Sequence, residues 1–296
     1  MQFIKITIIN LFYHLKWFIL KDFFHKKTIT RRVNNRYIME LSTVGKGIER
    51  QLYVYGVREY LDTQIVITTV QPGMTVLDLG ANIGYYTLLL SKLVGSSGNV
   101  IAVEPYHPNI VRLKKNISIN NLLNIKIYEL ALTNHTGSIN FFIGQSHNLG
   151  SIINHKGTNN SISIKSVAFR EFVQNIKIDY LRMDIEGGEI NIFTEILENP
   201  NTAPKNILFE IHPTGTVDPD PKFTEILQDL VRIGYKPKFV VSSSNPDALS
   251  KFHKLGYQPV RQTDTNHSLF NTIKPEDLIK IAARRPKMTR SILLSR

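Results

Sequence analysis

The stretch of sequence that decides the fold is residues 75–94, which read TVLDLGANIGYYTLLLSKLV. Its first five residues are rich in Val and Leu and predict a buried β-strand. Residues 80–84 (GANIG) place two glycines where the chain must turn, and residues 85–94 repeat apolar side chains at helical spacing. This order of strand, glycine turn and helix is typical of the first unit of a ligand-binding α/β sheet.

The alternation of strands and helices continues along the chain. Residues 99–103 (NVIAV) predict a second buried strand, residues 109–120 a helix and residues 125–130 a third strand. Between residues 137 and 167 apolar and polar residues alternate instead, which predicts an antiparallel insertion. The fold class that follows is α/β, with a mostly parallel sheet, helices on both faces and a β insertion.

The parallel pattern resumes in the second half of the chain. Residues 178–184 (IDYLRMD) predict a fourth strand, followed by a glycine turn at 186–189 (EGGE) and a helix that reaches residue 197. Residues 206–211 (NILFEI) predict a fifth strand, which leads into His212-Pro213. The remaining expected elements are a loop up to Pro221, a helix over 222–233, and strands near 238–242 and 268–272.

The charge of the chain is concentrated at its two ends. The 296 residues carry 36 Lys and Arg against 24 Asp and Glu, a formal net charge of +12. Residues 1–36 contribute +7 of this charge and residues 284–296 contribute +5, so the stretch 37–283 is formally neutral. A nucleic-acid enzyme needs basic residues around its active site, so we expect no nucleic-acid partner. The absence of cysteine excludes thiol nucleophiles, disulfides and thiolate metal sites.

These charges suggest three parts: a basic N-terminal helical extension (1–36), a central domain (37–283, with the insertion at about 137–167) and a basic C-terminal tail (284–296). Residues 3–20 predict a helix that either packs on its own domain or lies on an anionic membrane surface. Lys5 and Lys16 disfavour a spanning helix, and the order of charged and apolar residues disfavours a signal peptide. We expect a cytoplasmic protein, with peripheral membrane contact left open.

The glycine turn limits the ligand. The dinucleotide fingerprint G-x-G-x-x-G is missing, because Gly80 and Gly84 are separated by Ala81-Asn82-Ile83, so NAD is a weak second choice. Asp78, two residues before the first glycine, repels a diphosphate and suits a ligand with an ammonium group. Glu104, after the second strand, can bind ribose hydroxyls. S-adenosylmethionine has the ammonium group and no phosphate.

Four blocks of this sequence together resemble the FkbM family of S-adenosylmethionine-dependent methyltransferases. They are DLGANIGYYT (78–87), VEP (103–105), RMDIEGGE (182–189) and FEIH (209–212). The resemblance covers roughly residues 50–272 and implies a class I methyltransferase Rossmann-like fold with seven strands, the last of them antiparallel. It also implies methyl transfer to a hydroxyl group on a sugar, a glycolipid or a small natural product.

The resemblance implies the following cofactor contacts. Gly80, Asn82 and Gly84 would line the methionine part, Glu104 would hold the ribose and Ala131 would border the adenine. The full set of cofactor-binding candidates is Asp78, Gly80, Asn82, Gly84, Tyr85, Glu104, Ala131 and Asp184. Tyr85 either contacts the cofactor or packs the first helix. Two positions depart from the family pattern: Arg182 stands for the usual lysine, and Ala168-Phe169-Arg170 for Thr-Leu-Asp.

Methyl transfer to an alcohol requires removal of the hydroxyl proton, so the site needs a base or a cation that stabilises the alkoxide. The catalytic candidates are Asp184, Glu210 and His212, and His212 is favoured as the base because it shares a strand face with Glu210. The same three residues could ligate Mg²⁺ or Mn²⁺, but their spacing demands no metal, and we assign no metal ligand. A non-catalytic cofactor-binding scaffold, a nucleic-acid methyltransferase and an NAD-dependent oxidoreductase remain as competing interpretations.

Overall fold

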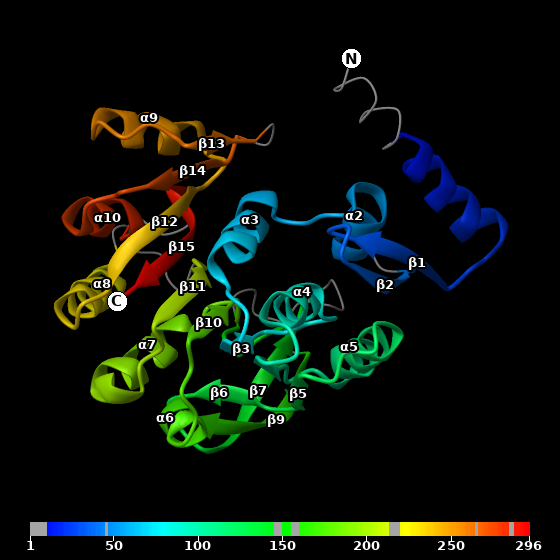
Figure 1. Cartoon of the computed structure of the whole chain (residues 1–296), viewed down its shortest axis with the longest axis horizontal. Coiled ribbons are helices and arrows are strands. Elements are labelled where there is room, and N and C mark those ends of the chain that lie inside the picture. The colour runs from blue at the N-terminus through cyan, green and yellow to red at the C-terminus, as the bar shows by residue number, and fades with distance from the viewer. Residues whose placement is uncertain are drawn as a thin grey trace.

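A computed structural model describes residues 11–44, 47–144, 150–154, 160–212, 220–263, 266–283 and 287–296 (Figure 1). Four sequence-based expectations fall partly outside this range. They concern the predicted N-terminal helix, the insertion at about 137–167, the proline-rich loop after His212 and the C-terminal tail.

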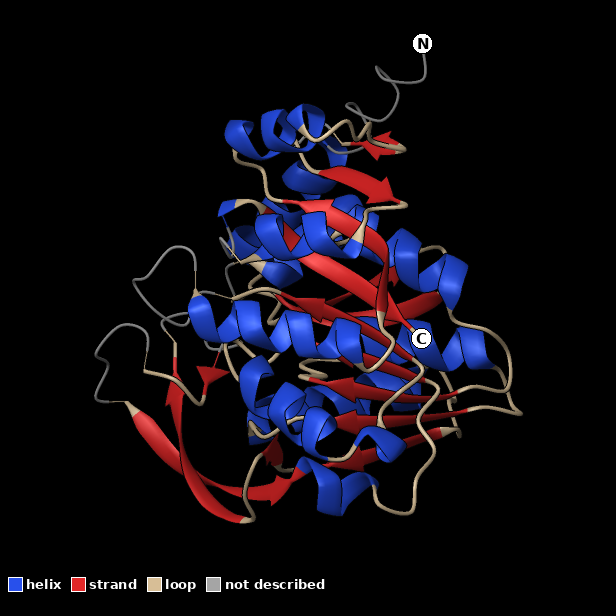
Figure 2. Ribbon diagram, turned by 90° about the vertical axis from the view of Figure 1, so that its left-hand side faces the viewer, coloured by secondary structure: helices blue, strands red, loops and turns tan. Residues whose placement is uncertain are grey.

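The core of the described chain is a nine-stranded mixed sheet in the order β13-β14-β12-β15-β11-β10-β3-β4-β5. Figure 2 shows the twisted sheet with helices packed against it. Its strands are β3 (Thr75–Leu79), β4 (Asn99–Val103), β5 (Ile125–Tyr128), β10 (Tyr180–Met183), β11 (Asn206–Glu210), β12 (Lys236–Ser242), β13 (Arg261–Gln262), β14 (Ser268–Asn271) and β15 (Thr289–Ser295). Neighbours from β5 to β11 pair in parallel, which confirms the predicted α/β fold class.

The C-terminal segment differs from the expected basic tail. Residues 289–295 form β15, which lies between β11 and β12 and is antiparallel to both. The physical reason is the apolar run Ile292-Leu293-Leu294, whose side chains are almost completely buried. The strand near 268–272 is present as β14, but it lies farther out and pairs with β12. The antiparallel strand that the family resemblance implies inside the sheet is therefore β15.

Helices cover both faces of the sheet. On one face, α6 (Phe169–Val173), α7 (Glu189–Glu198), α8 (Pro221–Arg232), α9 (Pro246–Lys254) and α10 (Pro275–Ala282) pack with inward residues such as Leu79, Met183 and Phe209. On the other face, α2 (Ile48–Tyr55), α3 (Tyr60–Thr69), α4 (Tyr85–Val94) and α5 (His107–Ile119) pack with Val76 and Leu208. Alternate residues of each strand thus enter different cores, as the pleat of a strand requires.

The predicted insertion forms a separate small sheet. Within the predicted bounds lie β7 (Gly137–Ile143), β8 (Gly150–Ser151) and most of β9 (Ser161–Ala168), and the sheet also takes in β6 (Ala131–Thr133), which precedes them; the order is β6-β9-β7-β8. β7 is antiparallel to both β8 and β9, as the alternating pattern predicts. Phe141 and Ile164 form a small apolar cluster with Ala131. The insertion therefore stands beside the end of the main sheet.

The N-terminal segment contains a helix over residues 11–18, continued by η1 (Ile19–Phe23), and the hairpin β1 (Thr28–Val33) and β2 (Tyr37–Ser42). The boundary proposed at residue 36 falls in the turn of this hairpin, because a count of charges does not detect that β1 and β2 pair with each other. Tyr37, Met39 and Leu41 enter the same core as α4. The hairpin is thus packed on the catalytic domain, and only the helix before it stands at the periphery (Figure 1).

Leu293→Ala tests the position of β15. Truncating a buried leucine between two strands leaves a cavity, so we expect a loss of about 2 to 5 kcal/mol in the free energy of unfolding. Leu123→Ala is the control, because Leu123 is 97% exposed and its truncation should cost less than about 0.5 kcal/mol. Urea unfolding measures both values, and equal small losses would contradict the strand.

Candidate active site

A cleft opens at the carboxyl ends of β3, β4, β10 and β11, where an open α/β sheet binds its ligands. It encloses about 1090 Å³ of empty space, open solvent at its mouth included. Its floor is the glycine turn after β3, and one wall comes from the insertion through Phe141, Gly150 and Ile152. Each predicted strand end thus contributes to one common site.

Gly80 makes the approach of β3 and β10 possible. Its φ is +81°, and a Cβ at this position would lie 2.0 Å from the backbone oxygen of Asp184. Gly84 has a different role, since a Cβ there would meet Leu88 and Leu113 at 2.6 and 2.7 Å. Gly80 therefore lines the cleft, whereas Gly84, among the described residues, serves the packing of α4 against α5.

Glu104 lies in the cleft directly after β4, as predicted. Its carboxylate accepts hydrogen bonds from the backbone N–H groups of Asn82 (2.8 Å) and Tyr106 (3.0 Å) and from the Asn109 amide (3.2 Å). Burial raises the pKa of Glu104 to about 7, although these hydrogen bonds oppose the shift. Glu104 is consequently ionised most readily when a ligand supplies further hydrogen-bond donors.

Asp78 differs from its predicted role as a cofactor contact. Its carboxylate is fully buried, and it accepts a hydrogen bond from the Thr87 hydroxyl at 2.6 Å and one from Arg182 Nη1 at 3.4 Å. Asp78 is not among the described residues that line the cleft. It sits behind Arg182, so any influence on a ligand passes through that guanidinium group.

Arg182, which replaces the family's lysine, connects the two central strands. Its Nη2 lies 2.7 Å from Asp184 Oδ2, and its Nη1 donates to the Gly80 carbonyl at 3.2 Å. Its guanidinium carbon lies 4.2 Å from the centre of the Tyr86 ring, in a cation–π contact. Burial opposes the charge of Arg182, but Asp184 and Asp78 outweigh it and raise the pKa.

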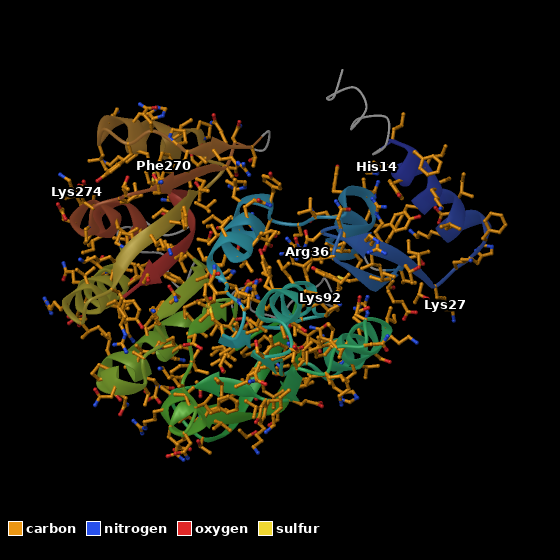
Figure 3. All side chains as sticks on the ribbon, in the orientation of Figure 1. His14, Lys27, Arg36, Lys92, Phe270 and Lys274 are labelled. Carbon is orange, nitrogen blue, oxygen red and sulfur yellow. The ribbon has the colours of Figure 1, made fainter. Side chains whose placement is uncertain are left out.

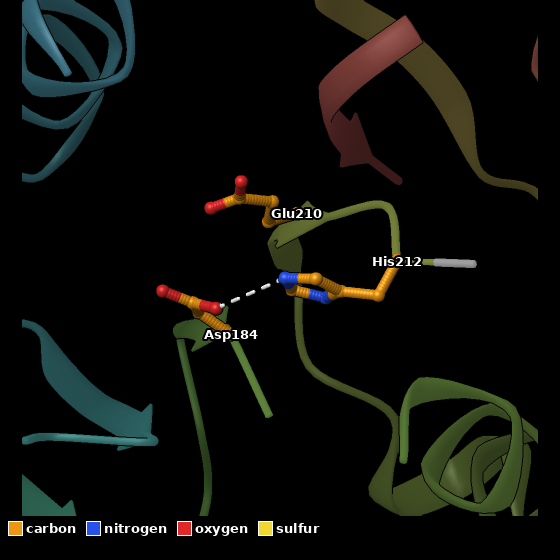
Figure 4. A group of neighbouring side chains, drawn as sticks. All are labelled: Asp184, Glu210 and His212. Carbon is orange, nitrogen blue, oxygen red and sulfur yellow. Dashed lines mark ion pairs between the residues drawn. The ribbon is translucent and has the colours of Figure 1, made fainter. Parts of the chain in front are cut away.

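The three catalytic candidates lie together (Figure 4). Asp184, Glu210 and His212 can each place one ligand atom within 4.8 Å of the others, so the trio has the ligand types to hold a divalent cation. Arginines already compensate two of its members: Arg182 pairs with Asp184, and Arg290 Nη2 lies 3.7 Å from Glu210 Oε1. The carboxylates are thus balanced by side chains of the protein itself.

His212 has surroundings that disfavour a base. Its Nδ1 lies 2.8 Å from Glu189 Oε1, and its Nε2 lies 3.5 Å from Asp184 Oδ1 and 3.6 Å from Glu186 Oε2. Burial lowers the pKa of His212, but the hydrogen bond to Glu189 and the charges of Asp184 and Glu186 outweigh it and raise the value to about 10. The imidazole is therefore protonated at neutral pH and has no free lone pair for a proton.

The surroundings of Glu210 differ from those of His212. It lines the cleft at the end of β11, whereas His212 is not among the described lining residues. Burial raises the pKa of Glu210 to about 8, with a further contribution from the negative charges of Asp184 and Glu59. A pKa close to the working pH is what efficient proton transfer requires.

The outer part of the site contains residues that the sequence analysis missed. Glu59 accepts a hydrogen bond from the Tyr86 hydroxyl at 2.9 Å and pairs with Arg290 Nη2 at 3.0 Å. Arg58 pairs with Glu59 through its Nε and also lines the cleft. The one sequence feature that could have pointed to Arg58 and Glu59 was Gly56, which lies just before them. In the structure Gly56 ends α2 with a positive φ. The charge count assigned Arg290 to a basic tail, and no sequence pattern indicated that it lies in the site.

The remaining cofactor candidates all line the cleft, but the hydroxyl group of one of them, Tyr85, is bonded inside the protein. Asn82 and Ala131 line the cleft, and Ala131 does so beside Leu130, Leu132 and Phe141. Tyr85 also lines it, but its hydroxyl donates to the Arg58 carbonyl at 2.8 Å and lies 2.8 Å from the Thr63 hydroxyl. The phenol of Tyr85 therefore belongs to an internal network.

Sequence comparison identifies the family. The model of the FkbM methyltransferase domain matches residues 78–237, which is more than half of the chain. The chain belongs to the FkbM methyltransferase family. No curated protein matches this FkbM methyltransferase in sequence.

Solved structures similar to this FkbM methyltransferase are distant. Fibrillarin from Aeropyrum pernix, solved with S-adenosyl-L-methionine, is 14% identical with a TM-score of 0.41, over 83% of this chain and 93% of its own. TYW2 from M. jannaschii, in complex with AdoMet, is 11% identical with a TM-score of 0.43, over 92% and 87%. An O-methyltransferase from Thermotoga maritima is 15% identical with a TM-score of 0.41, over 81% and 66%.

Gly80→Ala tests the close approach of β3 and β10. Its Cβ would collide with the Asp184 carbonyl, so we expect a loss of more than about 3 kcal/mol in unfolding free energy. Gly256→Ala is a matched control, because Gly256 has nearly the same φ (+86°) with nothing within 4 Å of the added Cβ. Its cost should be the backbone strain alone, about 1 to 2 kcal/mol. Equal losses in chemical denaturation would refute the close approach.

Proposed function

We propose that this FkbM methyltransferase uses S-adenosylmethionine to methylate a hydroxyl group on a sugar, a glycolipid or a small natural product. The observation that carries the hydroxyl acceptor is Glu210, a cleft-lining carboxyl group whose pKa of about 8 suits proton removal. An amine acceptor would not need such a base once deprotonated. The resemblance of the sequence blocks to the family supports the same acceptor class.

The cleft fits the proposed cofactor. Its described lining residues include the glycine turn, Glu104 and an apolar wall, one feature for each part of the cofactor. Glu104 would hold the ribose hydroxyls, and the apolar wall of Leu130, Ala131 and Phe141 would take the adenine. The backbone of the glycine turn, which has no room for a Cβ at Gly80, would take the methionine part. Bound S-adenosylmethionine would supply the activated methyl group.

The side chains of the protein would supply position and proton transfer. Glu210 would accept the proton of the acceptor hydroxyl, and the charged Arg58 and Arg290 beside it would stabilise the developing negative oxygen. Asp184, kept in place by Arg182, would orient the acceptor. His212 would act as a positioning residue that fixes Asp184 from the other side.

Cofactor binding is tested first, by isothermal titration with S-adenosylhomocysteine, which needs no knowledge of the acceptor. Hydrogen bonds from ribose favour the ionised form of Glu104, and ionisation is lost as the pH falls below its pKa of about 7. We expect affinity to rise with pH up to about 7 and to drop about tenfold for each unit below it.

Glu104→Gln should weaken binding at high pH and flatten this dependence. Glu129→Gln, an exposed carboxylate outside the cleft, is the control and should retain the dependence. No binding by the folded wild-type protein would favour the non-catalytic scaffold, and an unchanged Glu104 variant would remove the ribose assignment.

Glu210→Gln tests the base. Since the amide keeps the shape and loses the proton acceptor, we expect turnover to fall by about 10² to 10⁴ with S-adenosylhomocysteine affinity nearly unchanged. The wild-type rate should rise with pH up to about 8, because Glu210 must be ionised to accept a proton. The measurement is steady-state methyl transfer to an acceptor found by screening sugars and glycolipids.

His212→Gln is the comparison variant, and a positioning role predicts a smaller loss than that of the Glu210 variant. A larger loss of turnover in the His212 variant than in the Glu210 variant would indicate that His212 is the base. A divalent metal is the second arrangement that the geometry of Asp184, Glu210 and His212 permits. Loss of activity on chelation, restored by Mg²⁺ or Mn²⁺, would replace the base mechanism by metal activation of the hydroxyl.

A further inference from the structure

The N-terminal helix carries an apolar face that points away from the rest of the described protein. Its members recur at helical spacing within an arc of roughly 120°. They are Leu11, Phe12, Leu15, Phe18 and Ile19, with side chains between 39% and 69% exposed. An exposed patch of this kind on a helix marks a surface for a partner or a membrane.

The opposite side of the helix is attached to the domain. Trp17 is only 5% exposed, and its ring centre lies 5.3 Å from that of Tyr53 on α2. Tyr13 packs edge-on against the same Tyr53, and the Arg31 guanidinium lies 3.7 Å from the Tyr13 ring centre. The helix is therefore held by one face, and the contacts that hold it present the apolar face outward.

Basic side chains accompany the apolar face. Lys16 lies over the Phe12 ring at 5.9 Å, and Lys21, Lys26 and Lys27 follow at the end of the helix. The charged residues of the segment 11–27 are these four lysines and a single acid, Asp22. Figure 3 shows Lys27 and His14 at the outer edge of the protein, on the side occupied by this helix. The patch thus combines apolar and cationic surface.

We propose that this face of the N-terminal helix docks on an anionic lipid bilayer, with the apolar side chains in the interface and the lysines on lipid phosphates. The combination of exposed Phe and Leu with adjacent lysines matches this surface in both polarity and charge. A second copy of the chain would bring the lysines of both copies together, which like-charge repulsion disfavours. Among the described helices, none has the length and apolar character to cross a bilayer.

The test is co-sedimentation of the full chain with vesicles of phosphatidylcholine, with and without about 30% phosphatidylglycerol. We expect binding to the anionic vesicles that decreases as salt is added. The double variant Leu15→Glu/Phe18→Glu should lose at least tenfold in partitioning, because it places two carboxylates in the apolar face. Leu123→Glu is the matched control: Leu123 is 97% exposed on another part of the protein, and its variant should bind like the wild type.

A second variant separates charge from apolar contact. Lys26→Glu/Lys27→Glu should reduce binding to anionic vesicles and weaken its salt dependence while leaving the apolar face intact. All variants change exposed residues, so S-adenosylhomocysteine titration and thermal unfolding should match the wild type. Failure of the wild type to bind anionic vesicles, or equal binding by the Leu15/Phe18 variant, would overturn the proposal. Sedimentation of a dimer that this variant dissociates would assign the face to a second copy instead.

Discussion

The active site depends on one buried cation, Arg182. A guanidinium group in the protein interior is tolerated only when carboxylates and carbonyls satisfy it, and here Asp78 and Asp184 lie on either side. Its additional hydrogen bond to the Gly80 carbonyl joins the glycine turn to the end of β10. The cofactor side and the acceptor side of the cleft are therefore one electrostatic unit. Because Gly80 has no Cβ, the glycine turn can approach the backbone carbonyl of Asp184 closely enough for these contacts.

The acceptor side of the site is completed by segments outside the part that matches the family. Glu59 precedes α3 and Arg290 lies on β15, yet they are paired at 3.0 Å beside Glu210. Arg290 also lies 3.6 Å from Asp62. The matched core thus contains the proposed cofactor contacts and the proposed base Glu210, while Glu59 and Arg290, which lie outside it, set the charge around Glu210.

Sequence patterns predicted the inner half of the site because it follows from local structure. Buried strands end in recognisable residues, and parallel strands place their carboxyl ends at one edge, so Gly80, Glu104 and Asp184 could be brought together without coordinates. The outer half depends on tertiary pairing. A count of charges treats Arg290 as solvated, whereas the fold places it among carboxylates. The same charge count gave no indication of β15, because its short apolar run is surrounded by basic residues. No local sequence pattern predicts that a C-terminal strand lies inside the sheet.

The assignment of the base shows why residue type alone is insufficient. An isolated histidine is the usual base at neutral pH, but three carboxylates around His212 stabilise its cationic form, so the imidazole already holds its second proton at neutral pH. Burial, together with the charges of Asp184 and Glu59, also raises the pKa of Glu210, but only to about 8, so this carboxyl group exchanges its proton near neutral pH. Alternation along the strand correctly placed both residues near Asp184. Their proton affinities depend on burial and on carboxylates from separate segments, the β10–α7 region and Glu59 before α3, which only the fold brings together.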